Sequence, residues 1–113
     1  MTRINLAIQW IRRDFAEPIG VERLAQRASM SVSAFHRHFK AVTNLSPLQY
    51  QKRVCLLQAR TLMVANVKSV MAAAFEVGYE RATQFSRDYA RVFGLPPGQD
   101  AGRVLGNMKA VRG

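Results

Sequence analysis

The sequence predicts an all-α fold. Apolar residues recur at helical spacing along most of the chain, and serine, glycine and proline punctuate these segments. No segment shows the apolar–polar alternation that is typical of a strand. With 113 residues and 49% apolar content, the chain suffices for one small domain or two tightly coupled subdomains.

The first elements follow from an apolar stripe and its punctuation. The stripe that begins at Ile4 predicts a first helix, which ends by about Glu17 because Pro18 follows. A short helix is then expected over residues 21–28, although Gly20 stands where Ser or Thr would cap better.

The middle of the chain carries two stronger helix starts. Ser31 is a good N-cap for a helix over residues 32–43. Ser46 and Pro47 give a cap and a first-turn proline to the longest expected helix, residues 47–65. At 1.5 Å per residue, this segment would be a rod of roughly 28 Å.

The second half repeats the alternation of helices and turns. After a linker at residues 66–68, a helix is expected over 69–77, with Gly78 as its left-handed end. A further helix over residues 82–93 ends before Gly94, and the tail from residue 98 is expected to be frayed or weakly helical.

One pattern occurs twice, fifty residues apart. Residues 35–39 read Phe-His-Arg-His-Phe, and residues 85–89 read Phe-Ser-Arg-Asp-Tyr. A short apolar segment precedes each copy, at residues 24–30 and at residues 73–79. These two segments are forty-nine residues apart, whereas the patterns are fifty apart, so the second turn holds one extra residue. A short helix, a tight turn and a second helix form the unit that places a reading helix in a DNA groove.

The charge of the chain is strongly positive. There are 17 Lys and Arg against 7 Asp and Glu, a formal net charge of +10, and residues 23–75 contain no carboxylate. Such a surface attracts polyanions, chiefly nucleic acid and then anionic membranes.

Projection on a helical wheel separates two faces on each proposed reading helix. Phe35, Phe39 and Val42 share one face of the segment 32–43, with Val32 and His38 at its margins. Phe85, Tyr89 and Val92 share the corresponding face of 82–93. The outward side chains predicted to read bases are Ser33, His36, Arg37, Thr83, Ser86 and Arg87. Those predicted to contact phosphates or flank the site are Ser31, Lys40, Lys52, Arg81, Gln84 and Arg91.

Other chemistry-bearing residues favour structural roles. Cys55, the single cysteine, excludes an intrachain disulfide and is expected to be a buried thiol. His36 and His38 point apart on a helix, so the sequence predicts no metal site. For Arg53 and Arg60, contacts with a phosphate and with a carboxylate are both open.

Several classes of protein are disfavoured. No phosphate-binding loop, nucleophile–base set or carboxylate pair is present, so neither an enzyme nor a bound cofactor is expected. No signal peptide or membrane-length apolar run is present, which together with the single cysteine predicts a cytoplasmic protein. The methionines at 30, 63 and 71 are expected to fill the core.

The chain resembles the DNA-binding domain of AraC/XylS-type bacterial transcription regulators. The resemblance covers about residues 4–97. It rests on Leu24-Ala25, Ser31-x-Ser33, Phe35-x-Arg37-x-Phe39-Lys40, Ser46-Pro47-x-x-Tyr50, Ala59-Arg60-x-Leu62-Met63, Ala74-x-x-Val77-Gly78-Tyr79, Gln84-Phe85-Ser86-Arg87 and Phe93-Gly94-x-Pro96-Pro97. Two departures from the family pattern are Ser29, which replaces a frequent turn glycine, and Gln99-Asp100, which replaces a Tyr-Arg ending.

The resemblance implies seven helices in two helix-turn-helix subdomains joined by a long linker helix. The subdomains would be about residues 4–46 and 69–97, with the linker at 47–65 and a tail at 98–113. The two reading helices would enter successive major grooves of double-stranded DNA, as in a transcription activator or repressor. RNA polymerase and an effector or dimerisation domain outside this chain are candidate partners. Similarity of residues 31–40 and 46–52 to a subgroup with a further N-terminal domain favours a fragment of a longer regulator.

Two rival interpretations also fit the charge. A non-specific basic RNA-binding or nucleic-acid-binding protein would display aromatic side chains for stacking, whereas the wheel turns Phe35, Phe39, Phe85 and Tyr89 inward. A cationic membrane-surface protein would have long exposed amphipathic helices, whereas these are short and punctuated.

Overall fold

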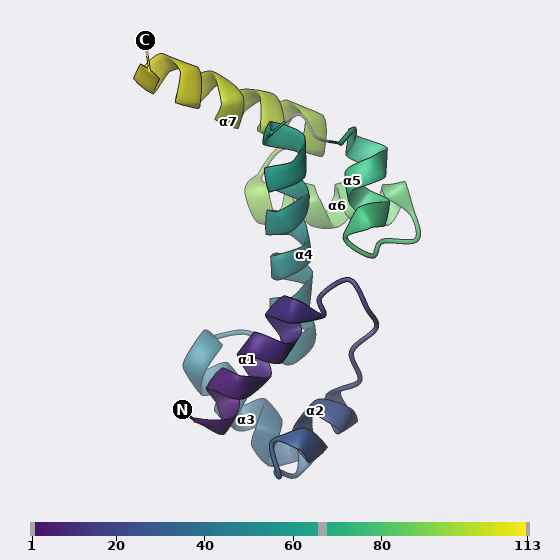
Figure 1. Ribbon diagram of the computed structural model, residues 1–113, viewed down its shortest axis with the longest axis vertical. Helices are drawn as coiled ribbons and strands as arrows, with labels where there is room; N and C mark the ends of the chain where they lie inside the picture. The colour runs from purple at the N-terminus through teal and green to yellow at the C-terminus, as the bar shows by residue number, and fades with distance from the viewer. Residues whose placement is uncertain (1, 66–67, 113) are drawn as a thin grey trace. The chain divides into compact units, whose positions relative to one another are not determined.

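The computed structural model describes residues 2–65 and 68–112, and these ranges contain seven helices and no strand, as the sequence predicts (Figure 1). The helices are α1 (Arg3–Arg13), α2 (Val21–Arg27), α3 (Val32–Thr43), α4 (Pro47–Val64), α5 (Val70–Glu76), α6 (Ala82–Phe93) and α7 (Pro97–Arg112). Residues 66 and 67 of the expected linker lie outside the described residues.

The chain divides into two compact units. The first spans Met1–Val54 and contains α1, α2, α3 and the start of α4. The second spans Cys55–Gly113 and contains the rest of α4 with α5, α6 and α7. Each unit has its own buried side chains.

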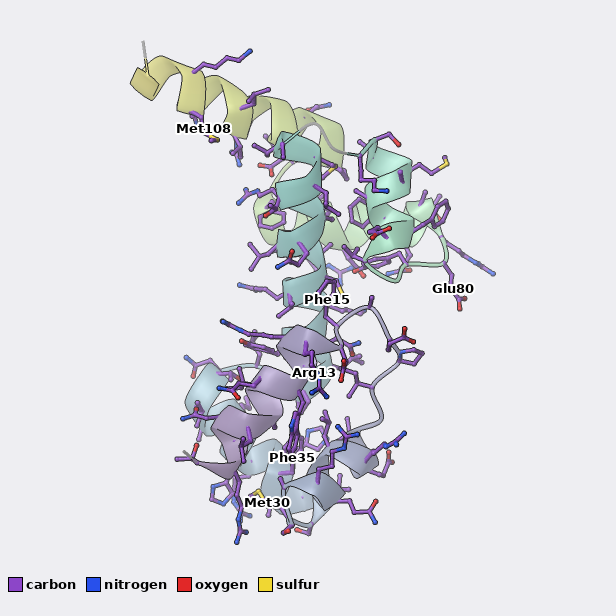
Figure 2. The ribbon with its side chains drawn as sticks, in the orientation of Figure 1. Arg13, Phe15, Met30, Phe35, Glu80 and Met108 are labelled. Atoms are coloured by element: carbon purple, nitrogen blue, oxygen red, sulfur yellow. The ribbon has the colours of Figure 1, made fainter. Side chains whose placement is uncertain are left out.

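The core of the first unit forms where α1 and α2 pack on α3. Phe35 and Phe39 of α3 lie at its centre with their rings 5.6 Å apart, and Phe35 points into the unit in Figure 2. The other members are Ile4, Ala7, Ile11, Leu24, Ala25 and Ala28. The apolar faces predicted from helical spacing therefore meet in one cluster.

In the second unit α6 packs against both α5 and α7. Phe85 and Tyr89 occupy the places that Phe35 and Phe39 hold fifty residues earlier, again 5.6 Å apart. The other buried apolar residues of the unit are Cys55, Leu56, Ala59, Met63, Ala73, Ala74 and Val77. The repeat in the sequence thus corresponds to a repeat in packing.

Side-chain caps set most helix starts where the sequence predicts them. Ser31 accepts a hydrogen bond from the backbone N–H of Ala34 and begins α3. Ser46 and Gln49 form a reciprocal capping box, in which each backbone N–H donates to the other side chain, and α4 follows. Ser69 caps α5 in the same way as Ser31 caps α3.

The end of α1 differs from the prediction. The helix stops at Arg13, four residues before Glu17. The side-chain amide of Gln51 donates to the carbonyls of Phe15 and Glu17, at 3.0 and 2.8 Å, and holds this segment in a non-helical turn. The contact is long-range, so local sequence carries no sign of it.

Three residues are more exposed than the helical pattern predicts. Val42, placed on the inner face of α3, is 56% exposed, and Met71, expected in the core, is 58% exposed. His38, expected at the core margin, is also exposed. Met63 is buried and Met30 partly buried, as expected.

The tail expected to be frayed or weakly helical is the helix α7, which packs on α6. Within the part of the chain that the structure describes, no helix combines the length and apolarity needed to cross a bilayer.

Candidate nucleic-acid interface

The turn between α2 and α3 brings the second helix of the first unit into position. Ser29 adopts a left-handed backbone with φ of 56°. The backbone N–H of Met30 then donates to the carbonyl of Ala25 at 2.9 Å, which reverses the chain after α2. Because Ala28 and Leu24 are buried, the turn is fixed by packing as well as by hydrogen bonds.

The turn between α5 and α6 repeats this geometry at an offset of forty-nine. Gly78 takes the left-handed position with φ of 103°, and the N–H of Tyr79 donates to the carbonyl of Ala74 at 3.0 Å. Glu80 is the extra residue, and its side chain points away from the unit (Figure 2). The prediction of a left-handed Gly78 is confirmed, and Ser29 adopts the strained conformation that its replacement of glycine implies.

The outward face of α3 carries the predicted side chains. Ser33, His36, Arg37 and Lys40 are all exposed, and none of them is near a carboxylate on the same helix, because α3 has none. Val32, at the margin of the inner face, is also exposed, whereas the exposed Val42 lies on the inner face near the end of α3.

The outward face of α6 is similar but less polar. Thr83, Arg87 and Arg91 are exposed, whereas Ser86 is partly buried. Ala90, which stands where α3 has Lys40, is partly buried and adds no charge.

The flanking residues lie around these two helices. Ser31 and Arg81 are the N-cap residues of α3 and α6, and Arg81 makes no side-chain cap hydrogen bond. Lys52 lies on α4 and is exposed. Gln84 is exposed, and its amide donates to Asp88 one turn along α6 at 2.9 Å, which orients Gln84 along its own helix.

Asp88 is a buried carboxylate whose role the sequence analysis missed. It accepts hydrogen bonds from the hydroxyl of Tyr79 at 3.0 Å and from Gln84. Burial, and then the charge and hydrogen bonding of Asp88, raise the pKa of Tyr79. The pair fastens the turn to α6, whereas Met30 at the equivalent place in the first unit packs against the hydrophobic core. The co-occurrence of a tyrosine in the turn and an aspartate at position 88 was the available signal.

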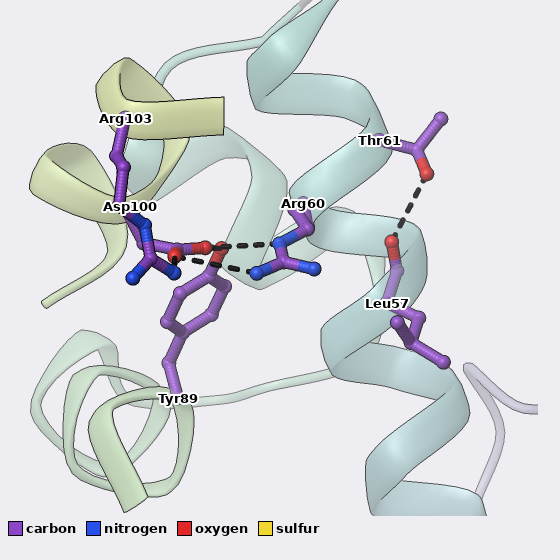
Figure 3. Close-up of polar contacts among 6 residues, drawn as sticks. All are labelled: Leu57, Arg60, Thr61, Tyr89, Asp100 and Arg103. Carbon is purple, nitrogen blue, oxygen red and sulfur yellow. Dashed lines mark hydrogen bonds and ion pairs between the residues drawn. The ribbon is translucent and has the colours of Figure 1, made fainter. Parts of the chain in front are cut away.

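Asp100 is the second buried carboxylate whose role the sequence analysis missed, and its side chain is 0% exposed. Its carboxylate accepts hydrogen bonds from Arg60 at 2.9 Å, from the hydroxyl of Tyr89 at 2.7 Å and from Arg103 (Figure 3). Burial alone would raise the pKa of Asp100, but the hydrogen bonds from Arg60 and Tyr89 and the charge of Arg60 lower it.

Arg60 therefore contacts a carboxylate, which decides between the two roles left open by the sequence. Its guanidinium also lies over the ring of Phe93, 3.9 Å from the centroid. The sequence does mark this position, because Gln99-Asp100 stands where the family pattern has Tyr-Arg. The partner of Asp100 could not be identified in this way, because Arg60 lies forty residues earlier.

Each unit thus presents the second helix of a helix–turn–helix with an exposed polar face. The arrangement defines a helix-turn-helix protein of the kind that inserts a helix into a groove of duplex nucleic acid. Comparison with known proteins leads to the same class.

A family model described as "Helix-turn-helix domain" matches residues 24–103. Among curated proteins, the chain is 36% identical over 95 residues to the HTH-type transcriptional activator RhaS of Escherichia fergusonii, covering 84% of this chain and 34% of that protein. RhaS of Escherichia coli strain SE11 is 31% identical over 96 residues, covering 85% of this chain and 34% of that protein. The chain spans about a third of the length of these relatives.

Solved structures show the same fold. The DNA-binding domain of AdpA, a global transcriptional factor solved in complex with a target DNA, superposes with a TM-score of 0.84 at 26% identity, covering 95% of this chain and 96% of that one. A probable AraC family transcriptional regulator from Rhodopseudomonas palustris gives a TM-score of 0.78 at 28% identity, with 89% and 95% covered.

The chain belongs to this helix-turn-helix family, as a DNA-binding domain of the AraC/XylS type. The family resemblance expected from the sequence is confirmed.

Proposed function

We propose that the chain binds double-stranded DNA sequence-specifically and acts as the DNA-reading domain of a bacterial transcription regulator. Two reading subdomains, about residues 4–46 and 69–97, are joined by the linker at about 47–65. The relatives are transcription regulators, and the AdpA domain is bound to a target DNA in its crystal structure.

The exposed face of α3 carries this proposal. Arg37 and His36 project from it, and the whole stretch of residues 23–75 lacks a carboxylate. Anionic phosphates would repel a carboxylate, and a guanidinium offers a paired donor that matches guanine in the major groove. Any solvated surface helix has a polar outer face, but solvation alone does not explain the repetition of the pattern fifty residues later or the lack of carboxylates on α3.

The base-reading set is Ser33, His36 and Arg37 on α3 and Thr83, Ser86 and Arg87 on α6. Five of these six are exposed, which supports their access to bases. Since Ser86 is partly buried and Ala90 is apolar, α6 contributes fewer polar groups than α3.

The phosphate-binding and flanking set is Ser31, Lys40, Lys52, Arg81, Gln84 and Arg91, all exposed. Ser31 and Arg81 stand at the first turns of α3 and α6, where the backbone N–H groups and the helix dipole also favour an anion. The side chains at these positions hold the reading helices against the backbone of the duplex.

The protein has no catalytic role in this proposal and acts in the cytoplasm through its partners. Double-stranded DNA is the direct ligand. RNA polymerase and an effector or dimerisation domain act beside it, as expected for an activator whose relatives are about three times as long.

The test is selection of bound duplexes from a random pool, with wild-type protein and with Arg37→Ala. The wild type should enrich a consensus, and Arg37→Ala should lose preference at one position, at a cost of about 1–3 kcal/mol for that base pair. Arg37→Lys is the matched control, because it keeps the charge but lacks the bidentate fork, and should lose preference while retaining general affinity.

An unchanged consensus with Arg37→Ala would show that Arg37 does not read a base. Binding of single-stranded RNA with equal affinity and the absence of any enriched duplex would overturn the proposed function as a whole. Lys40→Ala should instead weaken all duplexes alike and reduce the salt slope by about 0.9.

A further inference from the structure

The helix α6 is held inside its unit by two buried carboxylates on different sides. Asp88, on α6 itself, accepts from Tyr79 in the preceding turn. Asp100, on α7, accepts from Tyr89 near the C-terminal end of α6. Among the residues that the structure describes, these two are the buried charged side chains. The polar face proposed to read DNA lies on the opposite side of α6 from Tyr89.

The attachment to Asp100 is dense. Oδ2 of Asp100 accepts from the Tyr89 hydroxyl at 2.7 Å and from Nε of Arg60 at 2.9 Å, and Oδ1 accepts from Arg60 Nη2 at 3.3 Å (Figure 3). Arg60 also covers the ring of Phe93, whose centroid lies 4.5 Å from that of Tyr89. Two side chains from the last turns of α6 are therefore fixed by one carboxylate–guanidinium pair.

Within its described residues, the first unit solves the same packing problem without a buried carboxylate. Position 39 is Phe and position 50 is Tyr, and these rings meet edge to face at 5.6 Å. Fifty residues later the same two positions are Tyr89 and Asp100. The second unit thus has a hydrogen bond to a buried anion where the first has an aromatic contact. A hydrogen bond to an ionised group is short and directional, so it constrains the position of Tyr89 on α6.

We propose that Asp100 is a positioning residue that sets the rotation of α6 through Tyr89, and thereby the base preference of the second reading helix. The inference rests on the proposed function. It makes the first turn of α7 part of the reading unit. Arg87 lies two residues from Tyr89, so a change in the rotation of α6 moves the guanidinium directly.

Tyr89→Phe is the sharpest test, because it removes one hydroxyl and leaves the ring packing and the Arg60–Asp100 pair in place. Tyr50→Phe is the matched control, since it removes the one hydroxyl at the corresponding contact of the first unit, where Tyr50 accepts from Arg12 at 3.0 Å. Asp100→Asn is the second variant, and it removes the charge at nearly constant shape.

Each variant is measured on duplexes with the selected consensus and on duplexes with single changes in either half, at a temperature where its far-UV circular dichroism matches the wild type. Tyr89→Phe should reduce discrimination at positions read by α6 by about threefold to tenfold, with discrimination by α3 unchanged. Asp100→Asn should reduce it in the same positions, and Tyr50→Phe should leave those positions alone.

Tyr89→Phe with a lowered unfolding midpoint but full discrimination would mean that Asp100 only stabilises the fold, and would overturn the inference while leaving the proposed function standing. A wild-type protein that enriches no duplex would overturn the proposed function itself. A Tyr50→Phe variant that loses discrimination at the α6 positions would overturn the inference as well, because the effect would then not run through Asp100.

Discussion

Each helix–turn–helix contains one residue with a left-handed backbone, and the stability of the unit depends on which amino acid occupies that position. Gly78 has a φ of 103°, which a residue with a branched Cβ adopts only under strain. Ser29 holds the equivalent position with a φ of 56°, within the small left-handed region that non-glycine residues reach. The two turns share their hydrogen bonds but differ in tolerance to substitution.

Gly78→Val should destabilise the second unit by about 1–3 kcal/mol, because valine resists a positive φ. Trp10, the one tryptophan of the sequence, lies in the first unit and reports on it separately. In urea titrations the circular dichroism midpoint should fall while the Trp10 fluorescence midpoint changes less. Ser29→Gly is the counterpart and should stabilise the first unit by up to about 1 kcal/mol. An unchanged dichroism midpoint for Gly78→Val would contradict the strain argument.

Cys55 gives a second prediction at the scale of one residue. It is buried, and burial raises the pKa of its thiol to about 11. Since the thiolate is the reactive form, the folded protein should react with a thiol reagent at pH 8 far more slowly than the protein in denaturant. The rates can be compared by following release of thionitrobenzoate. Equal rates would show that the second unit opens readily around Cys55.

Among the elements, the helices that local signals define were predictable. The bounds of α3 and α6 match the expectation, because Ser31 caps one and Gly94 with a φ of 83° ends the other. The end of α1 was not predictable, because it depends on Gln51 thirty-four and thirty-six residues away. Local chemistry fixes caps and turns, whereas contacts distant in sequence fix ends such as this one.

The candidate site was predictable to a similar extent. The exposed faces of α3 and α6 follow from helical periodicity, and eleven of the twelve predicted site residues are exposed. The prediction that Val42 is buried was wrong. Helical periodicity gives the side of the helix on which a side chain lies, but not whether another element covers that side at that position. The roles of Asp88 and Asp100 were not predicted, because a sequence does not distinguish a buried, hydrogen-bonded carboxylate from a solvated one. Their tyrosine and arginine partners are identified only in the structure.

The attachment of α7 should depend on pH. In the folded protein the pKa of Asp100 lies below its ordinary value of about 4, so the folded state binds the proton less tightly than the unfolded state. The stability from this group is therefore complete above about pH 5 and is lost as the pH falls through the folded-state pKa. Urea midpoints of wild type and Asp100→Asn, measured from pH 6 to pH 2.5, should converge at the acid end. A constant gap would show that the charge of Asp100 does not hold α7.

At the scale of the whole molecule, charge and repetition act together. A net charge of +10 attracts any polyanion. The two helix–turn–helix units add two helices that are proposed to recognise bases, and with them sequence specificity. The charge alone predicts affinity that falls steeply with salt for any sequence. The repetition predicts a site on DNA with two parts.

The operator should contain two short boxes about one helical turn apart, roughly 34 Å, because the family resemblance implies that the reading helices enter successive major grooves. Inserting about half a turn of DNA between the boxes places them on opposite faces of the duplex. We expect binding of the single protein chain to fall to that of one box, measured by titration of duplexes with zero, five and ten inserted base pairs at one salt concentration. The ten-pair insertion restores the face but not the distance, so it separates the two requirements. Tight binding to the five-pair insertion would show either that the linker is flexible or that only one reading helix supplies specificity. Since α6 is less polar than α3, the second outcome would assign the specificity to α3.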